Sequence, residues 1–289
     1  MSAIVGSGDF SYEAEGNWGR GPHRPEFGLV SGVACDSQDR VYVFQRFPRS
    51  EMMVFEPNGR LITTWGDGAF EQAHGVWMSE DDILYVTDTN GHTVTQWTCD
   101  GTLLATWGTR GTPGVEAPFN RPTRAFRAPS GEVFVTDGYG NHRVHRFSAD
   151  GELELSWGTE GTGPGEFTRP VHNVCVDERG RVLVLDRGND RVQIFTRDGE
   201  YLDQWRDIAM PQEMLIDDDN TVYIIGGRLG TQHVTMMTLD GELIARWGEY
   251  GTAPGQFVGS PHGIWFDSRG DLYIIEVEAD NRMQKFVRR

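Results

Sequence analysis

Histidine recurs at one position of a repeated sequence pattern. His74, His172 and His262 each open a short apolar run, in HGVWM, HNVCV and HGIWF. Three neutral imidazole donors with an open fourth position are typical of a catalytic zinc site. A simpler alternative to a metal site is that each histidine makes its own hydrogen bonds within the channel. Their repetition favours one shared metal, with Zn²⁺ expected and Fe, Co, Mn or Ni also compatible with imidazole.

A repeat extends along the whole chain and determines where these histidines lie. Tryptophans recur every 42 to 50 residues, at Trp18, Trp65, Trp107, Trp157, Trp205 and Trp247, which is the length of a propeller blade. Residues 172–205 contain four short runs rich in β-branched residues, separated by ERG, RGND and RDG turns. Such runs predict strands, because they are too short for helices.

The sequence therefore predicts an all-β fold, a single six-bladed β-propeller over residues 1–289. The expected blades span 19–65, 66–107, 108–157, 158–205, 206–247 and 248–289, and the strand from 11–18 closes the last blade and removes a free sheet edge. The inner strands begin at Ser31, His74, Thr123, His172, Gln212 and His262. Alternate blades of a sixfold ring stand about 120° apart, so the three imidazoles are expected to converge on the channel axis.

Three further candidates lie in turns between the second and third strands of a blade. These turns are expected on the same face as the metal, because the chain returns there after two strands. Arg46, Tyr139 and Arg187 depart from the repeat pattern at these turns. A phenol can act as acid or base beside a metal, and guanidinium groups can clamp a carboxylate. Taken alone, each residue also fits a surface or turn role.

Other polar residues are expected to be structural. Asp88, Asp137 and Asp186 begin a D-x-x-N-x-R-like signature that would hydrogen-bond the turn after the second strand. His23 could line the rim of the metal-side face. The histidines without symmetry partners are expected to be structural or exposed, namely His92, His142, His145 and His233.

Composition narrows the functional classes. The formal net charge of −17 argues against nucleic acid and anionic membranes as partners. Three widely spaced cysteines indicate reduced thiols rather than a disulfide framework. No signal peptide and no apolar run of membrane-spanning length is visible, so a cytoplasmic location is expected.

The repeat resembles the NHL family of propellers, through GEFTRP and GQFVGSP and the D-x-x-N-x-R turns. Within it, AHGVWM, FVTDGYGNHRVHRF, VLDRGNDRVQIF and SPHGIWFD resemble peptidyl-α-hydroxyglycine α-amidating lyase, also called peptidylamidoglycolate lyase. The match covers blades two, three, four and six, with a weaker one at VYVFQRF in blade one.

The resemblance implies a zinc ion held by His74, His172 and His262, an active-site tyrosine at Tyr139, and active-site arginines at Arg46 and Arg187. It implies cleavage of an N-acyl-α-hydroxyglycine, a carbinolamide, into an amide and glyoxylate. The expected partner is therefore a small-molecule substrate that carries a carboxylate.

Two positions depart from the family. The resemblance implies a structural calcium that is held by an acidic residue directly after the blade-six histidine and by carbonyls matching Val33 and Val76. This chain has Gly263 at the acidic position, so calcium binding is doubtful. The resemblance implies a methionine in the substrate pocket at the position of Ser260, so the pocket could accept a different substrate.

Two alternatives stay open at the level of sequence. A metal-dependent hydrolase, either a lactonase or an amidase, would use a metal-bound water on the same three histidines. A non-catalytic NHL interaction scaffold is the other alternative, but a binding surface has no need of three symmetric channel histidines.

Overall fold

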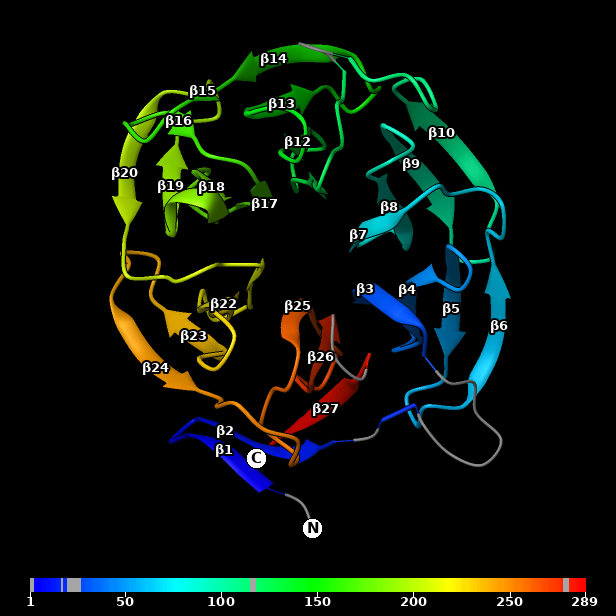
Figure 1. Cartoon of the computed structure of the whole chain (residues 1–289), viewed down its shortest axis with the longest axis vertical. Coiled ribbons are helices and arrows are strands. Elements are labelled where there is room, and N and C mark those ends of the chain that lie inside the picture. Colours follow the sequence, from blue (N-terminus) through cyan, green and yellow to red (C-terminus); the bar gives the residue numbers. More distant parts are fainter. Residues whose placement is uncertain (1–2, 17, 20–26, 115–117, 278–280) are drawn as a thin grey trace.

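The described residues form a ring of six blades around a central channel. The computed structural model describes residues 3–16, 18–19, 27–114, 118–277 and 281–289. Figure 1 shows the blades in chain order around the ring, with the inner strands facing the channel. The predicted six-bladed all-β propeller is confirmed.

Five blades are four-stranded antiparallel sheets that run outwards from the channel. The first two consist of β3 (Leu29–Cys35), β4 (Val41–Phe47), β5 (Glu51–Phe55), β6 (Leu61–Trp65), β7 (Ala73–Met78), β8 (Ile83–Asp88), β9 (Thr93–Thr98) and β10 (Leu103–Trp107). The third and fourth consist of β11 (Arg124–Arg127), β12 (Val133–Asp137), β13 (Arg143–Phe147), β14 (Leu153–Trp157), β17 (Val171–Val176), β18 (Val182–Asp186), β19 (Arg191–Phe195) and β20 (Tyr201–Trp205). The fifth consists of β21 (Glu213–Ile216), β22 (Val222–Gly226), β23 (His233–Met237) and β24 (Leu243–Trp247).

Two short elements accompany the fourth blade. A small parallel ribbon pairs β15 (Thr159–Glu160) with β16 (Glu166–Phe167). A single 3-10 turn, η1 (Arg187–Asn189), follows β18. No helix in the described ranges is long and apolar enough to cross a membrane.

The sixth blade joins the two ends of the chain. Its strands β25 (Ser260–Phe266), β26 (Leu272–Val277) and β27 (Met283–Arg288) are completed by β2 (Phe10–Glu15), which pairs antiparallel with β27. The predicted closure is confirmed, although β2 ends before Trp18. A fifth strand, β1 (Ala3–Ser7), pairs with β2 at the outer edge, and the sequence repeat did not predict it.

Tryptophans at the ends of outer strands pack against the neighbouring blade. Trp157 in β14 is buried and contacts Gly199, which has φ +77° and lies in the turn before β20. A Cβ at Gly199 would stand 2.9 Å from the indole ring, and positive φ also favours glycine. The same arrangement joins Trp205 to Gly241, where a Cβ would lie 2.5 Å from the indole. The repeat therefore joins each of these blades to the next through an indole that packs on a glycine turn.

The three cysteines lie within blades or beside them, without a disulfide among the described residues. Cys35 and Cys175 are buried, and Cys99 is half-buried. Burial raises the pKa of each thiol, and the pKa of Cys175 rises to about 12. Such thiols stay protonated and unreactive at neutral pH.

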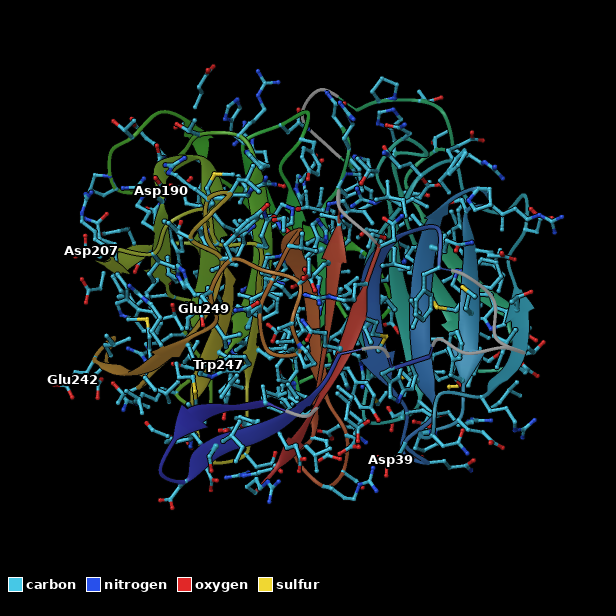
Figure 2. All side chains as sticks on the ribbon, turned by 60° about the horizontal axis from the view of Figure 1, so that its bottom comes forward. Asp39, Asp190, Asp207, Glu242, Trp247 and Glu249 are labelled. Carbon is cyan, nitrogen blue, oxygen red and sulfur yellow. The ribbon has the colours of Figure 1, made fainter. Side chains whose placement is uncertain are left out.

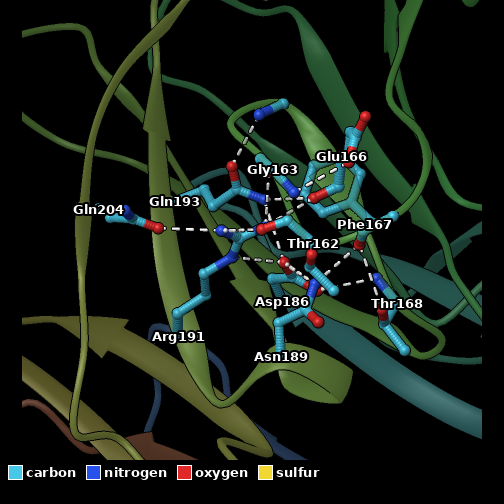
Figure 3. A network of polar contacts seen from close by, with 12 residues as sticks. Thr162, Gly163, Glu166, Phe167, Thr168, Asp186, Asn189, Arg191, Gln193 and Gln204 are labelled. Atoms are coloured by element: carbon cyan, nitrogen blue, oxygen red, sulfur yellow. Dashed lines mark hydrogen bonds and ion pairs between the residues drawn. The ribbon is translucent and has the colours of Figure 1, made fainter.

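An acidic residue at the end of the second strand fixes the loop that leads into the inner strand in blades two, three and four, namely Asp88, Asp137 and Asp186. Figure 3 shows this network in the fourth blade. Asp186 accepts hydrogen bonds from Asn189 at 2.8 Å and from Arg191 at 2.7 Å. The Arg191 guanidinium then donates to the backbone carbonyls of Gly163 at 2.9 Å and Glu166 at 2.8 Å. The turn signature is structural, as predicted, and it holds the approach to β17, which carries His172.

The turns at the two ends of the strands lie on opposite faces of the ring. Asp190 lies between β18 and β19, whereas Asp39 lies between β3 and β4. Figure 2 shows these two residues at opposite faces. The turn after each second strand therefore returns to the face where the inner strands begin, which places Tyr139 and Arg187 near the three histidines. Arg46 was expected in such a turn but lies within β4, one residue before the strand ends on the same face.

Candidate functional site

The three alternating histidines meet on the channel axis. The ring centroids of His74, His172 and His262 are 5.0, 5.0 and 5.1 Å apart, which is close to an equilateral triangle. Each offers one ligand nitrogen, and these atoms all lie within 4.8 Å of one another. All three residues are buried, with at most 3% exposure. The predicted convergence is confirmed.

Each imidazole is oriented by the backbone of the next blade. Nδ1 of His74 is 2.8 Å from the carbonyl oxygen of Thr123, and Nδ1 of His262 is 2.8 Å from that of Ser31. His172 makes the same bond to Gln212. These acceptors occupy the repeat position of the histidine in the three blades that lack it. A carbonyl only accepts, so Nδ1 must carry the proton and Nε2 keeps its lone pair.

A β-bulge accompanies each ligand position. The pairing of β17 with β18 shifts between Val171 and Asn173, so His172 is the extra residue. The pairing of β25 with β26 shifts between Pro261 and Gly263, around His262, and a shift in β7 spans His74. A bulge leaves the extra residue out of the strand ladder and re-aims its side chain. Here it turns each imidazole towards the axis.

Burial and positive charge keep these histidines neutral. Burial is the main reason that the pKa of each imidazole lies well below its ordinary value. The Arg46 charge acts in the same direction on the pKa of His74 and His262, and the Arg187 charge on that of His172. Neutral imidazole is the form that binds a metal ion.

The donor set fits a divalent transition metal. His74, His172 and His262 supply three neutral nitrogens from one layer of the channel. Their Nδ1 atoms are engaged by carbonyls, which is the usual outer-shell support of metal-ligating histidine. The residues therefore form a possible metal site.

Tyr139 lies directly beside the histidine triad. Its hydroxyl is 3.3 Å from Nε2 of His74 and 3.2 Å from Nε2 of His172. The Arg187 guanidinium donates to the same hydroxyl at 3.4 Å. Arg46 is fixed by a 2.8 Å bond from Nε to the carbonyl oxygen of Ala73, next to His74. The structure thus brings all six predicted residues into one site.

A cavity of about 720 Å³ opens over this site. Arg46, Tyr139, Arg187 and His262 line its inner part, together with Gln212 and Ser260 from the fifth and sixth blades. Apolar and cationic side chains form the rest of the wall, including Leu29, Met210, Arg228, Leu229, Tyr250 and Val258. The space is large enough for a drug-sized organic molecule.

A buried ion pair lies in the channel next to the histidine layer, and the sequence did not predict it. Arg124 begins β11 and Glu213 begins β21, and their side chains are 2% and 6% exposed. Their charged groups are 2.6 Å apart. Arg124 also donates to the carbonyl oxygen of Val76 at 2.6 Å. A guanidinium therefore bonds one of the carbonyls that the family resemblance had assigned to calcium.

The remaining histidines lie outside the triad. His145 is fully buried and bonds the Ser156 hydroxyl at 2.7 Å. His142 bonds the carbonyl oxygen of Phe167 at 2.8 Å, and His233 bonds that of Thr231 at 2.7 Å. These contacts agree with the expected structural roles. His23 falls outside the described residues.

Comparisons with known proteins identify relatives of this chain. No family model matches the sequence. NHL repeat-containing protein 3 of Homo sapiens is 32% identical over 96% of this chain and 84% of its own length. Peptidylglycine alpha-amidating monooxygenase of Rattus norvegicus is 32% identical over 66% of this chain but only 23% of its own length. A probable peptidyl-alpha-hydroxyglycine alpha-amidating lyase of Caenorhabditis elegans is 28% identical over 59% of this chain and 56% of its own.

Solved structures share the fold at low sequence identity. A gluconolactonase of Xanthomonas campestris has a TM-score of 0.69 at 15% identity, covering 96% of this chain and 90% of that one. A virginiamycin B lyase of Staphylococcus aureus has a TM-score of 0.66 at 13% identity, covering 96% and 99%. These similarities show the propeller fold alone. The sequence relatives go further: the chain belongs to the NHL-repeat six-bladed propellers and is related to the lyase domains of the amidating enzymes.

Proposed function

We propose that the protein is a metal-dependent lyase that cleaves the C–N bond of a small N-acyl-α-hydroxyglycine-like carbinolamide, giving an amide and glyoxylate. The observation that carries this proposal is the Tyr139 hydroxyl, which lies between Nε2 of His74 and Nε2 of His172 and accepts a hydrogen bond from Arg187. The relationship to amidating lyases supports the same reaction class.

Arg46 and Arg187 would bind the substrate carboxylate. Both line the cavity beside His262, and Nε of Arg187 is buried without a partner among the described residues. A buried donor without a partner is costly, and an anionic ligand would satisfy it. The two guanidinium groups would orient the carbinol carbon towards Tyr139.

His74, His172 and His262 would hold the metal ion, which supplies Lewis acidity at the substrate oxygen when it is bound. Tyr139 would take the hydroxyl proton of the carbinol and pass its own phenolic proton to the leaving nitrogen. The C–O bond becomes a carbonyl, the C–N bond breaks with its electron pair on nitrogen, and the tyrosine ends unchanged. The products are a primary amide and glyoxylate, and no water is consumed.

The test is the incubation of purified protein with N-benzoyl-α-hydroxyglycine. Equimolar benzamide and glyoxylate are expected, at a rate above that of the buffer alone and lost in an Arg187→Met variant. An amidase acting on the same compound would release benzoate instead, because water would cleave the acyl C–N bond. Release of benzoate, or no benzamide above the buffer rate, would contradict the proposed lyase. Hydrolysis of a lactone without benzamide release would indicate a hydrolase.

A further inference from the structure

A serine hydroxyl forms part of the cavity wall close to the proposed reaction centre. Ser260 begins β25, two residues before His262, and is half-buried. It lines the same cavity as Arg46, Tyr139 and Arg187. A substrate whose carboxylate is held by the two arginines must extend its acyl group along this cavity. Ser260 is therefore within the part of the wall that can contact the substrate.

A buried glutamine determines which way the Ser260 hydroxyl can donate. Nε2 of Gln212 donates to Oγ of Ser260 at 3.0 Å. Gln212 is 2% exposed, its backbone N–H bonds the Ile225 carbonyl at 2.8 Å, and its own carbonyl orients His172. Because the serine oxygen already accepts one hydrogen bond, its O–H proton points away from Gln212. With the amide in this orientation, no described residue accepts that proton, and Oε1 of Gln212 is buried without a partner among the described residues.

We propose that Ser260, held by Gln212, is a specificity-determining residue that donates its O–H to the acyl carbonyl oxygen of the substrate. This inference rests on the proposed function, because it takes the carboxylate to lie at Arg46 and Arg187. The amide carbonyl follows the carbinol carbon and nitrogen along the substrate, and it requires a donor when it is taken out of water. The substrate is therefore a carbinolamide, in which the nitrogen carries an acyl group, rather than a carbinolamine with a free amino group.

The same hydrogen bond assists the departure of the leaving group. As the C–N bond breaks, its electron pair moves onto a nitrogen that is conjugated with the acyl carbonyl. Part of the developing negative charge therefore lies on the carbonyl oxygen, where a fixed donor stabilises it. Loss of the Ser260 hydroxyl is expected to lower kcat as well as affinity.

The experiment compares two unreactive ligands by calorimetry on the wild-type protein, Ser260→Ala and Ser260→Thr. Hippurate (N-benzoylglycine) carries the carboxylate and the acyl amide. Its all-carbon isostere 4-phenylbutanoate carries the carboxylate and ring without the amide. Ser260→Ala should weaken hippurate binding roughly tenfold, the loss of one hydrogen bond, and leave 4-phenylbutanoate unchanged. Ser260→Thr keeps a hydroxyl and should retain most of the affinity for hippurate.

The outcomes separate this inference from the proposed function. Equal weakening of both ligands in Ser260→Ala, or no weakening of hippurate, would overturn the role of Ser260. Failure of both ligands to bind the wild-type protein would overturn the carboxylate pocket and, with it, this inference. Selective loss of hippurate binding together with no benzamide release from N-benzoyl-α-hydroxyglycine would overturn the lyase alone. Thermal melts of both variants would show that the fold is retained.

Discussion

Replacing Tyr139 by phenylalanine is expected to lower kcat for benzamide and glyoxylate release by about 10²–10⁴-fold, the usual contribution of a positioned acid or base. The phenol oxygen lies 3.3 Å from Nε2 of His74 and 3.2 Å from Nε2 of His172. Phenylalanine keeps the ring and removes the proton that is transferred. Steady-state kinetics on N-benzoyl-α-hydroxyglycine measures the change.

A matched variant separates this effect from a general loss of packing. Tyr201 lies in the outer strand β20, and Tyr201→Phe should leave kcat unchanged. Tyr139→Phe should also retain the metal content and hippurate affinity of the wild-type protein, because the phenol is neither a proposed metal ligand nor a carboxylate donor. A kcat within about threefold of wild type for Tyr139→Phe would exclude Tyr139 as the acid and base.

Replacing Arg124 by methionine is expected to lower the free energy of unfolding by about 3–5 kcal/mol, the cost of breaking a buried ion pair by removing one partner. Arg124 lies 2.6 Å from Glu213 and 5.5 Å from the ring centroid of Trp77. The variant would leave the Glu213 carboxyl buried without its cation. Urea unfolding measures the change.

Glu213, the second residue of the ion pair, provides a control variant and makes the free energy of unfolding depend on pH. Arg124→Met with Glu213→Leu should recover much of the lost stability, because no unpaired charge remains. Burial raises the pKa of Glu213 to about 7 from its ordinary 4.5. A carboxyl with a raised pKa binds its proton more tightly in the folded chain, so its contribution to stability is greatest below about pH 4.5 and is lost as the pH rises through about 7. The double variant should lack this dependence, and a single variant as stable as wild type would contradict the role of the pair.

The sequence predicted the ring and the histidine triad because both follow the repeat. Equivalent positions of successive blades lie at equal depth, so three histidines in alternate blades had to meet on the axis. The same argument placed Tyr139 and Arg187, since their turns return to the face where the inner strands begin. A repeat determines the position of the backbone, and that position was almost sufficient to predict where these side chains lie.

The sequence did not predict three features of the structure: the support of the histidines, the buried ion pair and the extra strand. None of them follows from the repeat. The bond from His172 to Gln212 and the bulge around His172 depend on local backbone geometry, which no residue type reveals. Arg124 and Glu213 occupy equivalent positions in blades three and five, and their opposite charges were the one available signal of pairing across the channel. The extra strand β1 pairs outside the repeat, so no periodicity could indicate it.

Metal analysis of the purified protein is the direct test of the histidine site. About one divalent transition-metal ion per chain is expected, and it should be removed by a chelator and restored by zinc. His172→Ala should lose this ion, whereas His233→Ala, whose imidazole bonds a local carbonyl, should retain it. Folded wild-type protein that holds no metal and takes up no zinc, or full occupancy in His172→Ala, would contradict a metal site formed by His74, His172 and His262.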